Sequence, residues 1–60
     1  MYLERILAQI SRMTEEELET LADEAILSYG KSDDEIERSE QLLIIMRAME
    51  EALSRGRKTH

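Results

Sequence analysis

The segment QLLIIMRAM, residues 41–49, places seven apolar residues in nine positions, with only Gln41 and Arg47 as polar members. A helix built from this segment carries apolar side chains around most of its circumference, and such a helix is normally buried on all sides. The chain has only 60 residues, and a domain of that size buries only about 60% of the surface that its unfolded form exposes. The segment therefore requires more covering surface than one short chain easily supplies.

Small domains are usually stabilised further by disulfides, by a structural metal or by association with another chain. The chain has no cysteine, which excludes disulfides and is typical of a reducing, cytoplasmic setting. A structural zinc site is not expected, because the only histidine is the last residue, His60. Association remains, and the sequence predicts a homodimer.

The composition predicts an all-α fold. Apolar residues make up 42% and charged residues 37% of the chain, with no Pro, Phe or Trp. The core is therefore built from Leu, Ile, Met and Ala, which form or tolerate helices, without the clusters of Val, Thr and aromatic residues that are typical of strands. No stretch approaches the roughly 20 apolar residues of a membrane span, so no membrane association is expected.

The first half of the chain contains a helix start at TEEE, residues 14–17. Thr14 followed three residues later by Glu17 is a capping box, and Met13 and Leu18 flank it as a hydrophobic staple. This predicts two short helices, over residues 2–12 and 15–29. The alternative is one long, kinked helix, because the apolar stripe continues through Thr14.

A second helix start lies at SDDE, residues 32–35, with Ser32 as N-cap and Glu35 as its reciprocal partner. Gly30, just before it, is expected to close the preceding helix in the left-handed conformation. The third helix then covers residues 33–55 and is about 34 Å long.

The predicted fold is a short helical bundle in one domain, residues 1–56, followed by a basic tail, residues 57–60. The two short N-terminal helices pack antiparallel on the long C-terminal helix, and dimerisation completes the bundle.

On a helical wheel, the third helix has one broad apolar face that is expected to meet the other two helices. Leu43 and Ile44 lie outside that face, and Ile36 lies seven residues before Leu43 on the same side. Leaving both side chains in water would forgo roughly 1.5–3 kcal/mol each. Ile36, Leu43, Ile44 and the adjacent Arg47 are therefore the predicted protein interface. The apolar face comprises Leu42, Ile45, Met46, Met49, Ala52 and Leu53, with Ala48 on its edge.

No motif in the chain is typical of a catalytic, cofactor or metal site, so no enzyme, no cofactor and no small-molecule substrate are expected. The carboxylates of residues 15–24 are typical of a solvated helix face, without the Glu-x-x-His pairing of a di-metal bundle. The pattern favours a small acidic protein that binds and regulates another protein, most simply by inhibiting it. The sequence does not separate a second copy from a different protein as the partner.

The alternative function is nucleic-acid binding by a dimer. Residues 1–54 carry five basic against fourteen acidic residues, a net charge of −9, whereas residues 55–60 carry +3. Arg55, Arg57 and Lys58 are the candidate phosphate contacts, and two tails in a dimer would act together.

Overall fold

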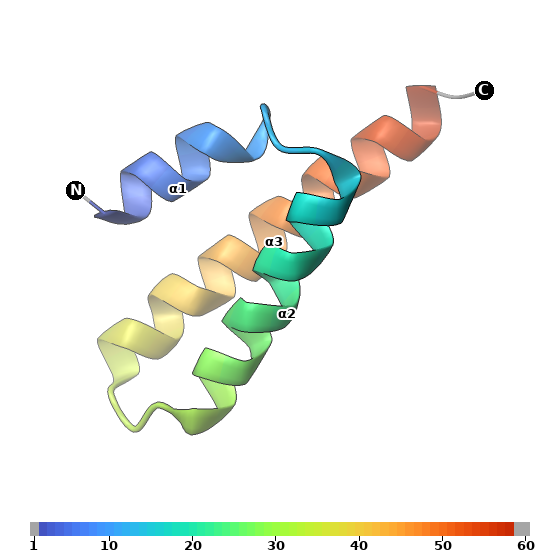
Figure 1. Ribbon diagram of the computed structural model, residues 1–60. Helices are drawn as coiled ribbons and strands as arrows, with labels where there is room; N and C mark the ends of the chain where they lie inside the picture. The colour runs from blue at the N-terminus through green and yellow to red at the C-terminus, as the bar shows by residue number, and fades with distance from the viewer. Residues whose placement is uncertain (1, 59–60) are drawn as a thin grey trace.

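A computed structural model of the chain describes the backbone of residues 2–58 and the side chains of residues 3–56. It contains three helices: α1 (Tyr2–Ile10), α2 (Glu15–Lys31) and α3 (Glu35–Lys58). Helices α2 and α3 form a long antiparallel hairpin, and α1 lies beside this hairpin and contacts α3 (Figure 1). The predicted all-α class is confirmed for the described residues, which include no strand.

Helix α1 does not have the predicted direction. Ile6, in the middle of α1, lines a small cavity together with Gln41 and Ile44, whereas Ile10 and Ser11 at its end lie beside Arg55. Helix α1 therefore advances along α3 in the same direction as α3. The expected antiparallel packing is right for α2 and wrong for α1, because the turn between α1 and α2 reverses the chain (Figure 1).

The break between α1 and α2 is where the capping box predicts it. The Thr14 hydroxyl accepts a hydrogen bond from the Glu17 N–H at 3.1 Å, and the Glu17 carboxylate accepts one from the Thr14 N–H at 2.9 Å. Two donors at the helix start are thus satisfied reciprocally. Met13 packs against the same buried cluster as Leu18, and the alternative of one kinked helix is wrong.

The turn between α2 and α3 uses a different cap from the predicted one. The Asp34 carboxylate accepts from the Ile36 N–H at 2.9 Å, and the Asp34 carbonyl accepts from the Arg38 N–H at 2.9 Å. Asp34 therefore occupies the N-cap position, and α3 begins two residues later than expected. The Ser32 hydroxyl instead accepts from the Asp34 N–H at 3.2 Å and shapes the turn. Both residue types cap helices well, so the sequence motif left two solutions.

Neither glycine ends a helix. Gly30 lies in the last turn of α2, and α2 ends when Ser32 becomes extended with φ −83° and ψ 137°. No glycine among the described residues has a positive φ, so the left-handed cap expected at Gly30 is wrong. Helix α3 also continues past Gly56 to Lys58, beyond its predicted end at residue 55.

The core lies where α3 meets both other helices. Ile44 and Ala48 are each only 2% exposed, and Ala48 packs with Ile10 of α1 and Leu18 of α2. The predicted core face of α3 is therefore wrong, because its large side chains are mostly exposed. Ile44, predicted at an outer interface, is also a correction, since it belongs to the interior. The inward seam of α3 comprises Gln41, Ile44, Ala48, Glu51 and Arg55, all buried or half-buried at a spacing of three and four residues.

This assignment predicts that two isoleucines on the same helix respond differently to the same small change. Ile44→Val should lower the free energy of unfolding by about 1 kcal/mol, because it leaves a cavity in the core. Ile36→Val is the control, because Ile36 is 74% exposed and should change stability by a few tenths of a kcal/mol at most. Urea denaturation followed by circular dichroism measures both. Equal effects would contradict the assignment.

Replacing the helical glycine near the turn tests the revised end of α2. A Cβ added at Gly30 would meet nothing within 4 Å, and Ala restricts the unfolded chain more than Gly. Gly30→Ala should therefore stabilise the protein by about 0.5–1 kcal/mol, raising the midpoint of thermal unfolding. A left-handed cap at this position would give the opposite sign.

Candidate functional site

The side of the hairpin that α1 leaves uncovered carries most of the exposed apolar residues. On α3, leucines and methionines recur at intervals of four, three and four residues and are each roughly half exposed. On α2, Ile26 lies four residues after Ala22, on the same side of that helix. We define the hairpin face as the set Ala22, Ile26, Leu42, Met46, Met49 and Leu53.

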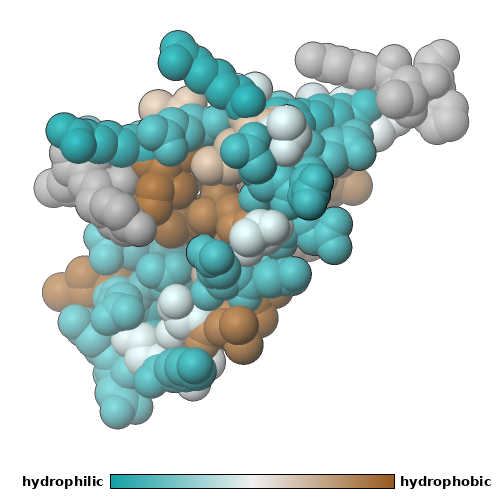
Figure 2. Space-filling view, viewed as in Figure 1, coloured by the Kyte–Doolittle hydropathy of each residue, from teal (hydrophilic) through white to brown (hydrophobic). Residues whose placement is uncertain are grey.

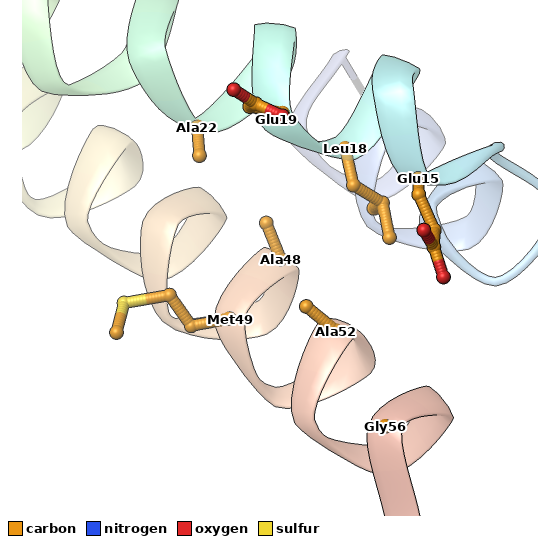
Figure 3. A pocket seen from close by; sticks show the side chains of 8 residues that line it. All are labelled: Glu15, Leu18, Glu19, Ala22, Ala48, Met49, Ala52 and Gly56. Atoms are coloured by element: carbon orange, nitrogen blue, oxygen red, sulfur yellow. The ribbon is translucent and has the colours of Figure 1, made fainter. Parts of the chain in front are cut away.

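A groove of about 450 Å³ lies between α2 and α3, and Ala22 and Met49 of the hairpin face line it. Its floor is formed by alanines from both helices, because these side chains end at Cβ and leave space above the seam. Figure 3 shows Ala22 directed toward α3, Ala48 and Ala52 directed toward α2, and Met49 extended along α3. Glu15 and Glu19 of α2 also line the groove and give one margin a negative charge.

The residues of the hairpin face are all apolar. No group of three or more His, Cys, Asp or Glu residues in the described part of the chain is placed to hold a metal ion. No side-chain polar atom buried among the described residues lacks a hydrogen-bond partner. What the face offers to a ligand is therefore apolar surface bordered by carboxylates.

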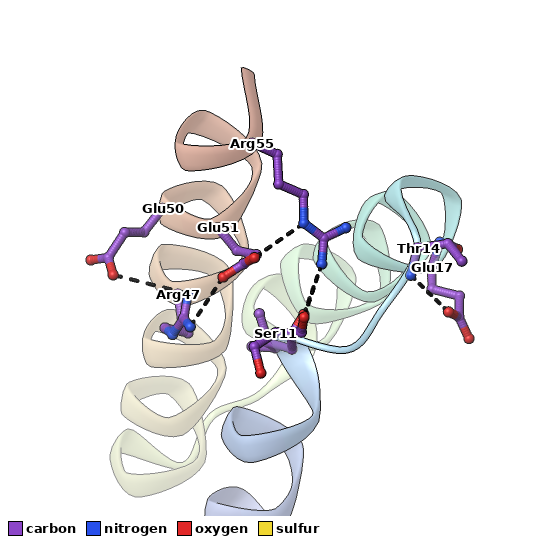
Figure 4. A network of polar contacts seen from close by, with 8 residues as sticks. Ser11, Thr14, Glu17, Arg47, Glu50, Glu51 and Arg55 are labelled. Carbon is purple, nitrogen blue, oxygen red and sulfur yellow. Dashed lines mark hydrogen bonds and ion pairs between the residues drawn. The ribbon is translucent and has the colours of Figure 1, made fainter. Parts of the chain in front are cut away.

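On the opposite side, Arg47, Glu51 and Arg55 of α3 form a set of polar contacts that joins α3 to the end of α1. We call this set the clasp. Arg55 donates hydrogen bonds to the carbonyl oxygens of Ile10 at 3.4 Å and Ser11 at 3.3 Å, where α1 ends. Its Nε also donates to the Glu51 carboxylate at 3.1 Å, and Arg47 pairs with that carboxylate at 3.2 Å (Figure 4). The guanidinium of Arg55 thus supplies donors to carbonyls at the end of α1, in addition to the hydrogen bond that the Ile10 carbonyl accepts from the Met13 N–H at 3.2 Å.

The clasp lowers the pKa of Glu51 below its ordinary value of 4.5. The hydrogen bond from Arg55 has the largest effect, burial opposes it, and the hydrogen bond and charge of Arg47 add to the lowering.

Figure 2 shows hydrophobic surface beneath α1, where it meets the hairpin, within a mostly hydrophilic side of the molecule. The clasp therefore holds α1 over the apolar interior.

The predicted interface residues lie in different environments. Ile36 and Leu43 are exposed on the flank of α3, outside the hairpin face, whereas Ile44 is buried. Arg47 is held by Glu51 and approaches Glu50 at 3.9 Å. Ile36 and Leu43 therefore lie outside the core as expected, and only Ile44 was placed on the wrong side of α3.

The candidate phosphate contacts are also separated. Arg55 is half-buried in the clasp and directed at α1, so its expected role as a free phosphate contact is a correction. The side chains of Arg57 and Lys58, and the whole of His60, lie outside the described residues. Sequence reasoning missed the clasp, because its partners are 44 and 45 residues apart.

The hairpin face was also missed, although one signal pointed to it. Its four α3 residues are spaced like the contact positions of a helix that packs against a second helix. Hydrophobicity alone assigned this stripe to the interior of one chain. The spacing is equally consistent with an interface between chains.

Comparison with known proteins gives no family model, no curated protein and no solved structure that matches this chain. Each of the helices described here is too short or too polar to cross a membrane.

Removing the charge of Glu51 should make the stability of the protein less dependent on pH. Because the pKa of Glu51 is lowered by folding, the ionised carboxylate stabilises the fold above pH 4.5, and this contribution is lost as the pH falls through the lowered pKa. Glu51→Gln should therefore lower the unfolding midpoint at pH 7 and approach the wild-type midpoint in acid. Glu50→Gln is the control, because the Glu50 side chain is exposed and its contact with Arg47 is long, at 3.9 Å. A constant difference at all pH values would contradict the role of the charge.

Proposed function

We propose that this chain is a small helical interaction protein that uses the hairpin face to bind polypeptides, a second copy of itself included. Through that contact it regulates a target protein, in the simplest case by inhibiting it. The observation that supports the proposal is the unpartnered apolar stripe of α3, Leu42, Met46, Met49 and Leu53, which lies outside the core of its own chain.

The chemistry of the face favours a polypeptide as ligand. The chain has a net charge of −6, and Glu15 and Glu19 border the groove. Nucleic acids and anionic lipid surfaces are repelled by such a margin. An amphipathic helix of a target meets the requirements, because it buries its own apolar side chains and can present Lys or Arg to the two glutamates.

Methionines at the centre of the face support binding to helices of varied shape. Met46 and Met49 are unbranched and flexible, so they adapt to the side chains of a ligand. A target helix held in this way is withheld from its other partners, which is the basis of the proposed inhibition.

Nucleic-acid binding is the weaker candidate. With Arg55 engaged by Glu51 and by the end of α1, that function rests on Arg57 and Lys58 alone. Two charges per chain give little affinity at physiological salt. A gel-shift experiment with DNA and RNA at low salt, on the full chain and on a chain ending at residue 56, decides whether the tail contributes.

Two exposed leucines provide a matched test of the face. Leu53 is 65% exposed on the hairpin face, and Leu27 is 62% exposed on the outer side of α2. Leu53→Lys should weaken target binding about tenfold or more, because it removes an apolar contact worth roughly 1.5–3 kcal/mol. Leu27→Lys should bind like the wild type, since its side chain points away from the face.

To measure binding, each variant is immobilised and incubated with a nuclease-treated extract of the native cells. The retained proteins are then quantified by mass spectrometry. Proteins that are kept by wild type and by Leu27→Lys but lost by Leu53→Lys are the expected result. Equal retention by all three chains would contradict the proposal. Circular dichroism establishes that both variants keep their helix content.

A further inference from the structure

We propose that the resting occupant of the hairpin face is a second copy of this chain, packed antiparallel along α3. This inference rests on the proposed function and specifies what covers the face when no target is bound. Three independent features support it: the area of the face, the symmetry of its stripe and the distribution of charge along the sequence of the helices.

The area is sufficient for a specific dimer. Five large side chains of the face are each about half exposed or more, and together they leave on the order of 500 Å² of apolar surface in water, at the upper end of what a monomer exposes. Two such faces in contact bury on the order of 1,000 Å² from these side chains alone, which reaches the lower limit of specific interfaces. The five are Ile26, Leu42, Met46, Met49 and Leu53.

The stripe reads the same in both directions. Its order is Leu, Met, Met, Leu, with spacings of four, three and four residues. A two-fold axis between Met46 and Met49 therefore places Leu42 opposite Leu53 of the second copy and Met46 opposite Met49. Residues of equal size then meet in each layer, as the self-complementary interface of a two-fold dimer requires.

The charges select the antiparallel direction. Helix α3 follows Asp33 and Asp34 and has acidic residues in its first turn, whereas no acid follows Glu51 and three basic residues do. Helix α2 likewise begins with three glutamates and ends at Lys31. Parallel packing would bring like charges together at both ends. Antiparallel packing brings unlike charges together and also opposes the helix dipoles.

The arrangement leaves α1 on the outside of the dimer. Helix α1 is fastened by the clasp to the side of α3 that carries Ile44, Ala48 and Arg55, away from the stripe. The two hairpins together then form a four-helix bundle in which neighbouring helices are antiparallel. A target that binds the hairpin face competes with the second copy, so the concentration of free face depends on the concentration of the chain.

The chain lacks cysteine, so single-cysteine variants test the arrangement directly. Leu42→Cys and Leu53→Cys each change an exposed side chain and leave the core intact. In the antiparallel dimer, residue 42 lies opposite residue 53 of the other chain, whereas the two copies of residue 42 are about 16 Å apart along the helix axis. A bis-maleimide with a reach of about 8 Å, close to the separation of packed helices, distinguishes these distances.

The two variants are produced with different tags, treated separately and as a mixture, and resolved by denaturing electrophoresis. The expected result is efficient cross-linking between Leu42→Cys and Leu53→Cys chains in the mixture, and little cross-linking of either variant with itself. Leu27→Cys is the control and should stay uncross-linked with every partner. Self-cross-linking of Leu42→Cys would indicate a parallel dimer and overturn the proposal.

Sedimentation velocity of the untreated wild type completes the test. A dimer at micromolar concentration is expected, and a chain that stays monomeric overturns the inference. The experiment needs no target protein, so a monomer that still binds a target through Leu53 would overturn the antiparallel dimer and leave target binding through the hairpin face standing. If Leu53→Lys and Leu27→Lys retained a target equally while the cross-links formed as expected, the antiparallel dimer would stand and target binding through the hairpin face would be overturned.

Discussion

The fold depends on the packing of α1 and α2 against one seam of α3. At the centre of that seam, Ala48 contacts Ile10 and Leu18 in the same small cluster. An alanine at this position lets two helices approach α3 closely, because its side chain ends at Cβ. A larger residue would disturb the contacts of all three helices, and a chain of 60 residues has little other buried surface to compensate for the loss.

This seam determines where the rest of α3 faces. Once Ile44 and Ala48 point inward, the leucines and methionines of the stripe must point outward, since a helix turns about 100° per residue. The hairpin face is thus a geometric consequence of the core. The clasp acts on the same seam, because Glu51 and Arg55 extend it toward the end of α1 and replace apolar contacts with paired charges.

Much of the local structure could be predicted from the sequence. The capping box of Thr14 and Glu17 involves neighbours only three residues apart, so its chemistry is visible in the chain itself. The direction of α1 and the inward face of α3 could not be predicted, because they depend on pairings across the whole chain. Gln41, Glu51 and Arg55 are polar, so a count of apolar residues does not detect the seam, and only the folded structure shows that Glu51 and Arg55 are paired.

The same reasoning explains why the candidate site was assigned to the core. Large apolar residues normally lie inside, so within a single chain Leu42, Met46 and Leu53 were expected in the core. In an assembly they can instead lie at an interface, because the interior of a small helical protein can be shared between chains. The two assignments of these residues therefore differ in whether a second chain covers the face in solution.

Methyl-labelled methionine provides the most direct measurement. Met46 and Met49 lie on the hairpin face, whereas Met13 packs in the core. We expect the methyl resonances of Met46 and Met49 to change position with protein concentration, while that of Met13 stays constant. Resonances that are independent of concentration, in a chain that remains a monomer throughout, would contradict it.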